Sequence, residues 1–252
     1  MNKKAVTDSE HQSRYSEAIR DARRKGDAVF QSWFNKSEDE NQSILQGYWD
    51  LSVHILKPKV CEYIISPESK TALEIGYGGG RILNAACSYF HQVIGIDIHE
   101  EQAAVQEFLH GQGKENFILL KTGGRTIDVE SGSIDFIYSF IVLMHLNSYE
   151  AFESYIRETQ RCLKRGGIAQ LYFGTFRKAT YIQRFIYSMR GYIELADAPV
   201  NYTSLLVNVP RIKRIARKLD LRILETGHSY KTVPTGYPGK RGGQDYVTLL
   251  KP

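Results

Sequence analysis

The sequence has little cysteine, lacks long apolar runs and begins with polar residues. Its three cysteines, Cys61, Cys87 and Cys162, are odd in number, widely spaced and outside any CxxC pair. This pattern argues against a disulfide framework and against a cysteine-built zinc site. No apolar run approaches the roughly 20 residues that a membrane helix requires, and the charged start differs from a secretory signal. We therefore expect a reduced, cytoplasmic protein without a membrane span.

Charge is modest overall but unevenly placed. The net charge is +5, yet residues 175–252 carry 14 basic and five acidic side chains, whereas residues 41–174 carry 11 basic and 15 acidic ones. A basic C-terminal third favours an anionic partner, such as a phosphorylated sugar, a lipid-linked glycan or a nucleic acid. A solvated helix face explains the same excess, because five of the cations fall on one predicted helix. These are Arg211, Lys213, Arg214, Arg217 and Lys218.

Length and patterning predict one main domain, residues 67–252, preceded by a helical N-terminal extension, residues 1–66, with helices over 9–25 and 55–65. Apolar runs predict seven strands, at 71–75, 93–98, 117–121, 134–140, 168–174, 221–227 and 246–251. Helical spacing lies between them, at 81–90, 100–110, 149–163 and 210–219. This alternation implies an α/β fold with a mostly parallel sheet, and the hairpin-like ending adds an antiparallel edge. The stretch 175–207 breaks the rhythm and is predicted to be an inserted cap.

The most informative segment is rich in glycine and follows the first predicted strand. Glycines at 76, 78, 79 and 80 lead into a predicted helix. Glycine lets the backbone adopt positive φ and approach a ligand closely, and a helix start offers free N–H groups. A dinucleotide site requires G-x-G-x-x-G, but Arg81 holds the third glycine position counted from Gly76. The pattern present is Glu74-x-Gly76-x-Gly78-x-Gly80.

This pattern resembles the first motif of the class I S-adenosylmethionine-dependent methyltransferases. Further segments resemble the family in the same order: the second strand ends with Asp97, segment 133–139 resembles the fourth-strand motif, and segment 163–167 resembles the turn before the fifth strand, with Arg165 in place of proline. The resemblance implies a Rossmann-like fold with a seven-stranded, mostly parallel sheet and S-adenosyl-L-methionine as cofactor. Three further segments resemble those of bacterial small-molecule or glycan methyltransferases: the helical part of the N-terminal extension, the loop at 139–146 and the Gly-Gly-Gln-Asp-Tyr-Val ending.

The resemblance also implies which residues hold the cofactor. They lie in the glycine segment and at the ends of the next three strands: Glu74, Gly76, Tyr77, Gly78, Gly80, Asp97, Ile98, Thr122, Gly123, Ser139 and Phe140. In the family the acid matching Asp97 accepts hydrogen bonds from the ribose hydroxyls. Glu74 either bonds the backbone N–H groups of the glycine segment or contacts the ligand. Many relatives place an acid after the third strand to meet adenine, but this chain has none there, which leaves backbone atoms or Thr122.

A hydroxyl acceptor must lose a proton during methylation, so a base within hydrogen-bond reach is useful. His145 follows the fourth strand, where the crevice opens, and histidine titrates near neutral pH. We therefore predict His145 as the general base, with a loop-anchoring role as the alternative. Rival bases or substrate contacts are His228, Tyr230 and Asp245. The sequence shows no convincing Asp/Asn cluster for magnesium, so we predict metal-independent chemistry.

Aromatic and basic residues in and beside the predicted cap are candidates for an acceptor pocket. They are Tyr172, Tyr181, Arg184, Tyr187, Arg190 and Tyr192, with Trp33, Tyr48 and Trp49 closing the pocket from the other side. The same aromatic spacing also fits the core of the cap.

The predicted function is methyl transfer to a hydroxyl of a sugar, glycan or other small molecule. The alternative is a methyltransferase of RNA or protein that uses the basic C-terminal third. The fourth strand reads Asp-Phe-Ile-Tyr at 135–138 and lacks an Asn-Pro-Pro-Tyr-type tetrapeptide, which weighs against amino-group chemistry. A non-catalytic binding protein that keeps the fold is a third reading.

Overall fold

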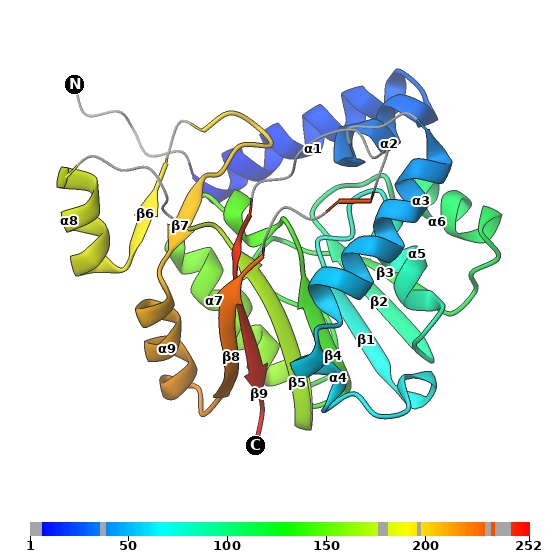
Figure 1. Ribbon diagram of the computed structural model, residues 1–252. Helices are drawn as coiled ribbons and strands as arrows, with labels where there is room; N and C mark the ends of the chain where they lie inside the picture. Colours follow the sequence, from blue (N-terminus) through cyan, green and yellow to red (C-terminus); the bar gives the residue numbers. More distant parts are fainter. Residues whose placement is uncertain (1–6, 36–38, 176–180, 196–197, 230–232, 235–242) are drawn as a thin grey trace.

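The computed structural model of the chain describes residues 7–35, 39–175, 181–195, 198–229, 233–234 and 243–252. Seven strands form one sheet in the order β3-β2-β1-β4-β5-β9-β8 (Figure 1). Their bounds are β1 (Thr71–Ile75), β2 (Gln92–Asp97), β3 (Phe117–Lys121), β4 (Ile134–Ser139), β5 (Leu163–Phe173), β8 (Arg222–His228) and β9 (Asp245–Leu250). Strands β1 to β5 are parallel, and β9 pairs antiparallel with both β5 and β8. The predicted Rossmann-like sheet with an antiparallel C-terminal edge is confirmed.

Each face of the sheet buries its own apolar core. Helices α7 (Tyr149–Cys162) and α9 (Val209–Lys218) cover one face, and α5 (Arg81–Cys87) and α6 (Gln102–Gly111) cover the other. Strand β1 is buried along almost its whole length because alternate side chains enter opposite cores. Two-sided burial explains why its sequence is a nearly continuous apolar run.

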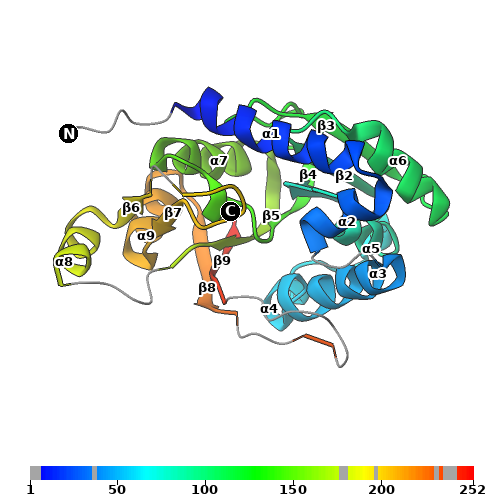
Figure 2. The same cartoon turned by 90° about the horizontal axis from the view of Figure 1, so that it is seen from above.

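Helices of the N-terminal extension lie over the sheet. Helix α1 (Asp8–Arg24) crosses above the upper, carboxyl ends of the parallel strands, with α2 (Asp27–Asn35) beside it (Figure 1, and from above in Figure 2). The buried side chains of α1 recur at intervals of three or four residues, so they form one stripe that faces the sheet edge. They are His11, Tyr15, Ile19 and Ala22. The domain boundary at 66/67 stays a prediction.

The predicted helix over 55–65 is wrong. Helix α3 (Glu40–Trp49) runs into a π-helix, η1 (Asp50–Ile55), and α4 (Pro58–Cys61) then adds a single turn. Lys57 has extended backbone angles, φ −67° and ψ 158°. The ring of Pro58 disfavours helical angles at the preceding residue, and this breaks the helix.

Segment 163–167, predicted to be the turn before the fifth strand, lies inside strand β5. The Gly166 N–H donates to the Lys251 carbonyl, and the Lys251 N–H donates to the Gly167 carbonyl. Lys164 also donates to the Asp135 carboxylate at 2.7 Å. These bonds to β4 and to the chain end extend the strand through the two glycines.

Two short strands and a helix follow in the cap. Strands β6 (Tyr192–Glu194) and β7 (Leu205–Val207) pair antiparallel, and helix α8 (Tyr181–Arg190) precedes them. Two 3₁₀ turns complete the described elements, η2 (Pro67–Ser69) and η3 (Leu143–His145). None of the helices in the described ranges is both long and apolar enough to cross a lipid bilayer.

The close approach of α3 to α5 gives a test of how the extension is attached. A Cβ atom at Gly47 would overlap the backbone carbonyl of Arg81. We expect Gly47→Ala to lower the free energy of unfolding by about 1–3 kcal/mol, because backbone cannot move aside as a side chain can. Urea denaturation measures this. Gly111→Ala is the control, since a Cβ there meets nothing within 4 Å; equal stability of the two variants would refute the contact.

Candidate active site

A cavity of about 370 Å³ opens at the carboxyl ends of the strands, beneath α1 and α2. Many of the residues predicted for the site line it: Glu74, Gly76, Tyr77, Gly78, Asp97, Ile98, Thr122, Phe140 and His145. Three others, Gly80, Gly123 and Ser139, are neighbours of wall residues in the sequence and do not form the wall. The volume falls in the range of small-molecule sites.

The glycine loop, residues 76–80, forms one wall of the cavity. Gly76, Gly78 and Gly80 have φ values of +79°, +53° and +84°, which favour glycine. A Cβ at Gly76 would overlap the Val142 side chain, and one at Gly78 would press on the Phe34 ring. Glycine therefore serves two purposes here, the turn itself and the close packing of other segments against it.

Asp97 at the end of β2 ties this loop to the neighbouring strand. Its Oδ2 accepts a hydrogen bond from the Gly78 N–H at 2.8 Å, and its Oδ1 accepts one from the Ile98 N–H at 2.7 Å. The side chain is 12% exposed and lines the cavity. An ionised carboxylate has about four acceptor positions, so two remain for hydroxyl groups of a ligand.

Glu74 is buried in the floor of the cavity. Its Oε2 accepts a hydrogen bond from the Tyr138 hydroxyl on β4 at 3.1 Å. The loop N–H groups bond to other acceptors: Gly76 to the Ile96 carbonyl, Gly80 to the Tyr77 carbonyl and Gly78 to Asp97. Burial raises the pKa of the Glu74 carboxyl to about 8, while the Arg81 guanidinium opposes the rise. At neutral pH this carboxyl is therefore largely protonated.

The loop after β3 uses the Thr122 hydroxyl to hold its own shape. The hydroxyl donates to the Thr126 carbonyl at 2.5 Å and accepts from the Gly124 N–H at 3.2 Å. Gln12 on α1 donates to the Gly123 carbonyl at 2.9 Å. A role for Thr122 toward adenine stays a prediction.

His145 is held by segments distant in the sequence. Its Nδ1 donates to the Tyr202 carbonyl at 2.8 Å, and its own carbonyl accepts from Nε2 of His11 at 2.7 Å. Burial lowers the pKa of the His145 imidazole below its usual 6.5. The ring is therefore neutral at pH 7, and with the proton on Nδ1 its Nε2 carries a lone pair.

Sequence analysis missed most of what α1 and α2 contribute to this site. The two helices contribute six residues to the cavity wall: His11, Gln12, Tyr15, Ile19, Trp33 and Phe34. Of these, the sequence predicted Trp33 alone. The signal was present in the spacing of His11, Tyr15 and Ile19, which lie four residues apart on one helix face.

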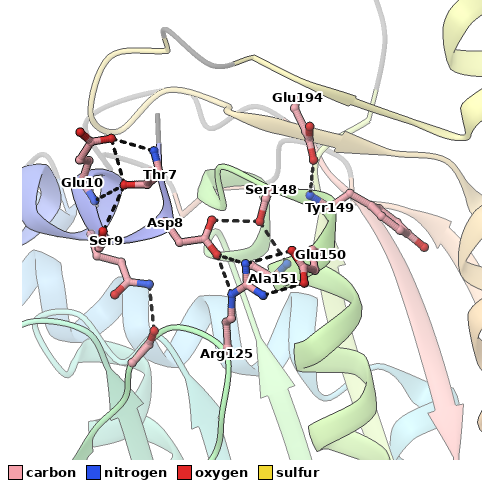
Figure 3. A network of polar contacts seen from close by, with 12 residues as sticks. Thr7, Asp8, Ser9, Glu10, Arg125, Ser148, Tyr149, Glu150, Ala151 and Glu194 are labelled. Carbon is pink, nitrogen blue, oxygen red and sulfur yellow. Dashed lines mark hydrogen bonds and ion pairs between the residues drawn. The ribbon is translucent and has the colours of Figure 1, made fainter. Parts of the chain in front are cut away.

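Polar contacts fasten the start of α1 beside the cavity (Figure 3). Arg125 Nε donates to Asp8 at 2.6 Å, and Ser148 donates to the other oxygen of Asp8 at 3.1 Å. Arg125 also pairs with Glu150 at the start of α7. Nearby, the Tyr149 N–H donates to Glu194 of β6 at 2.6 Å. These contacts join the extension, the β3 and β4 loops and the cap.

Two of the rival bases, His228 and Asp245, do not line the cavity. His228 Nδ1 and Asp245 Oδ1 are 2.8 Å apart at the ends of β8 and β9, and Tyr230 lies outside the described residues. Gly243 and Gln244, next to Asp245, do form wall.

Of the candidate acceptor contacts, Tyr172 belongs to β5 and is buried in the core, where its hydroxyl donates to the His54 carbonyl. The Tyr48 hydroxyl lies 2.7 Å from that of Ser88, and Trp49 is partly buried at the end of α3 outside the cavity wall. Tyr187 is partly buried and Arg190 exposed on α8. Tyr192 stacks on Tyr149 with centroids 4.2 Å apart. The side chains of Tyr181 and Arg184 lie outside the described part.

The described residues hold no group of three or more His, Cys, Asp and Glu side chains that could bind a metal ion. Metal independence of the reaction stays a prediction.

The sheet order, the glycine loop after β1 and the acid at the end of β2 define the class I S-adenosylmethionine-dependent methyltransferase fold. Comparison with known proteins agrees: residues 73–171 match a protein family described as a methyltransferase domain. Residues 73–171 thus form a methyltransferase domain of the class that uses S-adenosylmethionine as cofactor. A phosphoethanolamine N-methyltransferase of Triticum aestivum is 29% identical over 112 residues, which are 44% of this chain and 22% of that enzyme. The match therefore spans under a quarter of that relative.

Solved structures share the fold. A putative methyltransferase from Bacillus halodurans aligns with a TM-score of 0.58 at 15% identity, over 79% of this chain and 99% of that one. A methyltransferase from Methanosarcina mazei gives 0.57 at 18% identity, over 78% and 98%. The phosphoethanolamine N-methyltransferase 2 of Haemonchus contortus, in complex with phosphomonomethylethanolamine and S-adenosylhomocysteine, gives 0.56 at 17% identity, over 81% and 53%.

The residues present fit this cofactor. The two open acceptor positions of Asp97 match the two ribose hydroxyls, and the positive-φ glycine loop leaves backbone exposed to the cavity. Aromatic rings in the wall, including Tyr15, Trp33 and Phe140, suit a cation such as a sulfonium. The single negative charge of Asp97 beside a largely protonated Glu74 also suits a ligand with a net positive charge.

Replacement of Asp97 tests the ribose role. We expect Asp97→Asn to weaken S-adenosylhomocysteine binding about 10–100-fold, because hydrogen bonds to a charged acceptor are worth roughly 1.5–3 kcal/mol. Isothermal titration calorimetry measures the affinity. Asp220→Asn, an exposed change of the same kind, should leave it unchanged, and an unaltered affinity in Asp97→Asn would disprove the assignment.

Titration of Glu74 predicts a pH-dependent stability. The folded chain keeps this proton up to about pH 8, whereas the unfolded chain releases it near 4.5. The stabilisation is therefore complete below pH 4.5 and is lost as the pH rises toward 8. Relative to wild type, Glu74→Gln should show a free energy of unfolding that falls less between pH 5 and 8. If the free energy of unfolding of Glu74→Gln and wild type changed with pH in the same way, the prediction would be wrong. The control is Glu107→Gln, which alters an exposed carboxylate and should follow the wild-type pH dependence.

Proposed function

We propose that the protein methylates a hydroxyl group of a small, uncharged polar acceptor, such as a sugar or a natural product, with His145 as general base. The observation that carries the proposal is the hydrogen bond from His145 Nδ1 to the Tyr202 carbonyl. It fixes the neutral tautomer with a lone pair on Nε2 in a residue that lines the cavity. A proton acceptor of this kind is needed for an alcohol.

Helices α1 and α2 lie over the cavity and favour a small acceptor. Helices α1 and α2 contribute wall from one side and Gln244 from another, so the chain borders the site on both sides. The cations of α9 do not contribute to the cavity wall. Both points disfavour RNA or a folded protein as acceptor, because a large acceptor would have to fit between these walls and would meet no cation of α9 there.

Bound S-adenosylmethionine would supply an electrophilic methyl group. The chain's own part is to align the acceptor oxygen, to accept its proton at Nε2 of His145 and to keep water out. Leu146, Met144 and Val142 provide apolar wall beside the histidine. A dry site also keeps the imidazole neutral, since burial disfavours its charged form.

A second candidate is methylation of a phosphorylated amine, as the names of the wheat and nematode proteins suggest. Such an acceptor carries a phosphate that needs cationic partners. In the described part of the wall the guanidinium of Arg81 is paired with the buried Asp50 carboxylate. That pairing favours the uncharged acceptor.

Kinetics of a His145 variant separate catalysis from positioning. We expect His145→Gln to reduce kcat roughly 100-fold or more, within the range of general base catalysis, while S-adenosylhomocysteine affinity stays within about twofold, roughly 0.4 kcal/mol. Wild-type kcat should fall as the pH drops through the lowered pKa of His145, and the variant should lose this limb. His228→Gln is the matched control.

The choice between the two candidates is tested by incubating the protein and S-adenosylmethionine with a set of acceptors, hydroxylated small molecules on one side and phosphoethanolamine on the other. Product mass spectra that show methylation of phosphoethanolamine alone would overturn the proposal in favour of the second candidate. An equal loss of turnover and cofactor affinity in His145→Gln would reduce the histidine to a positioning residue.

A further inference from the structure

Helix α9 presents an exposed positive surface. Lys213, Arg214, Arg217 and Lys218, here called the basic face, are all exposed, while Ile212, Ile215 and Ala216 are buried against the domain. The basic residues stand at i, i+1, i+4 and i+5, so they share one side of the helix. In the described part of the chain these four side chains form no ion pair.

This arrangement costs the isolated fold some stability. Lys213 and Arg217, and likewise Arg214 and Lys218, are like charges four residues apart, and each such pair destabilises a helix by roughly 0.2–0.5 kcal/mol. Residues 209–222 hold six basic side chains and one acid, Asp220. Binding of an anionic surface would relieve the repulsion.

The neighbouring helix α8 exposes apolar side chains. Phe185 and Met189 are 64% and 69% exposed and lie four residues apart, on one side of the helix. Figures 1 and 2 both show α8 at the outer edge of the molecule, on the same side as α9. Arg190, also exposed, adds a cation next to Met189.

Specific contacts hold the two helices together. Asn208, the N-cap of α9, donates through its N–H to the Gly191 carbonyl at 2.9 Å and through Nδ2 to the Tyr187 carbonyl at 3.2 Å. Arg211 packs against Gly191, and its guanidinium lies 4.6 Å from the Tyr149 ring centre. The apolar pair and the basic face are therefore displayed by one continuous unit.

We propose that this unit, the basic face of α9 with Phe185 and Met189 of α8, docks the protein on an anionic lipid bilayer. Cations near such a surface are attracted by anionic headgroups, and apolar side chains beside them enter the boundary with the acyl chains. A nucleic acid would satisfy the cations and leave Met189 in water. The bilayer accounts for both kinds of side chain.

Vesicle co-sedimentation of the full chain tests the proposal. We expect binding to phosphatidylcholine vesicles that contain phosphatidylserine, weak binding to phosphatidylcholine alone, and a decrease with added salt. Neutralisation in the triple variant Arg214→Gln, Arg217→Gln, Lys218→Gln should weaken the binding about tenfold or more. The double variant Phe185→Ser, Met189→Ser should weaken it as well.

The control neutralises three exposed cations elsewhere, Lys25→Gln, Arg157→Gln and Arg165→Gln, and should bind like wild type. Equal binding to the two vesicle types, an equal loss in the control, or no loss in the double variant would each overturn the proposal. Stronger binding to single-stranded RNA than to the vesicles would also overturn it, in favour of a nucleic acid. The readout is independent of methyl transfer, so its failure leaves the proposed function intact.

Discussion

The hydrogen bond from the Gly78 N–H to the Asp97 carboxylate holds together the two strand ends on which the cavity depends. Three glycines of the loop adopt positive φ, which a free chain samples among many other conformations. A bond to a charged acceptor contributes roughly 1.5–3 kcal/mol toward selecting one of them. The same carboxylate lines the cavity with two acceptor positions to spare. One side chain therefore shapes the loop and presents the group that a ribose would meet.

Hydrogen bonds connect helix α1 and the cap to the proposed base, His145. His11 on α1 donates to the His145 carbonyl, Tyr15 accepts from the Asn201 N–H at 3.0 Å, and His145 itself donates to the Tyr202 carbonyl. The extension, the β4 loop and the cap therefore meet around one imidazole. Displacement of α1 would remove part of the cavity wall and the hydrogen bond from His11 to the His145 carbonyl together, so the wall and the placement of the proposed base are structurally coupled.

The ionisable side chains buried beneath the cavity are either paired or largely neutral. Asp50 on the π-helix neutralises the buried Arg81 guanidinium, and burial keeps Glu74 largely protonated at pH 7. An unpaired charge at either position would carry a large desolvation cost. The outer surface differs, because the basic face of α9 leaves its cations exposed to solvent without partners in the described chain. The interior thus suits a small cofactor, and the exterior a surface of opposite charge.

Local pattern alone determined the seven strands of the sheet and the glycine loop, because strand periodicity and glycine conformation are properties of neighbouring residues. The resemblance to the methyltransferase family indicated Asp97. The place of His145 after the fourth strand also followed, since parallel strands end at one edge of the sheet. Tertiary structure decided the rest. Tyr172, predicted for the acceptor pocket, is core because β5 is buried on both faces, and α1 of the N-terminal extension forms part of the cavity wall. His11 meets His145 across 134 positions of chain, and contacts of that range arise only from packing, which no local pattern encodes.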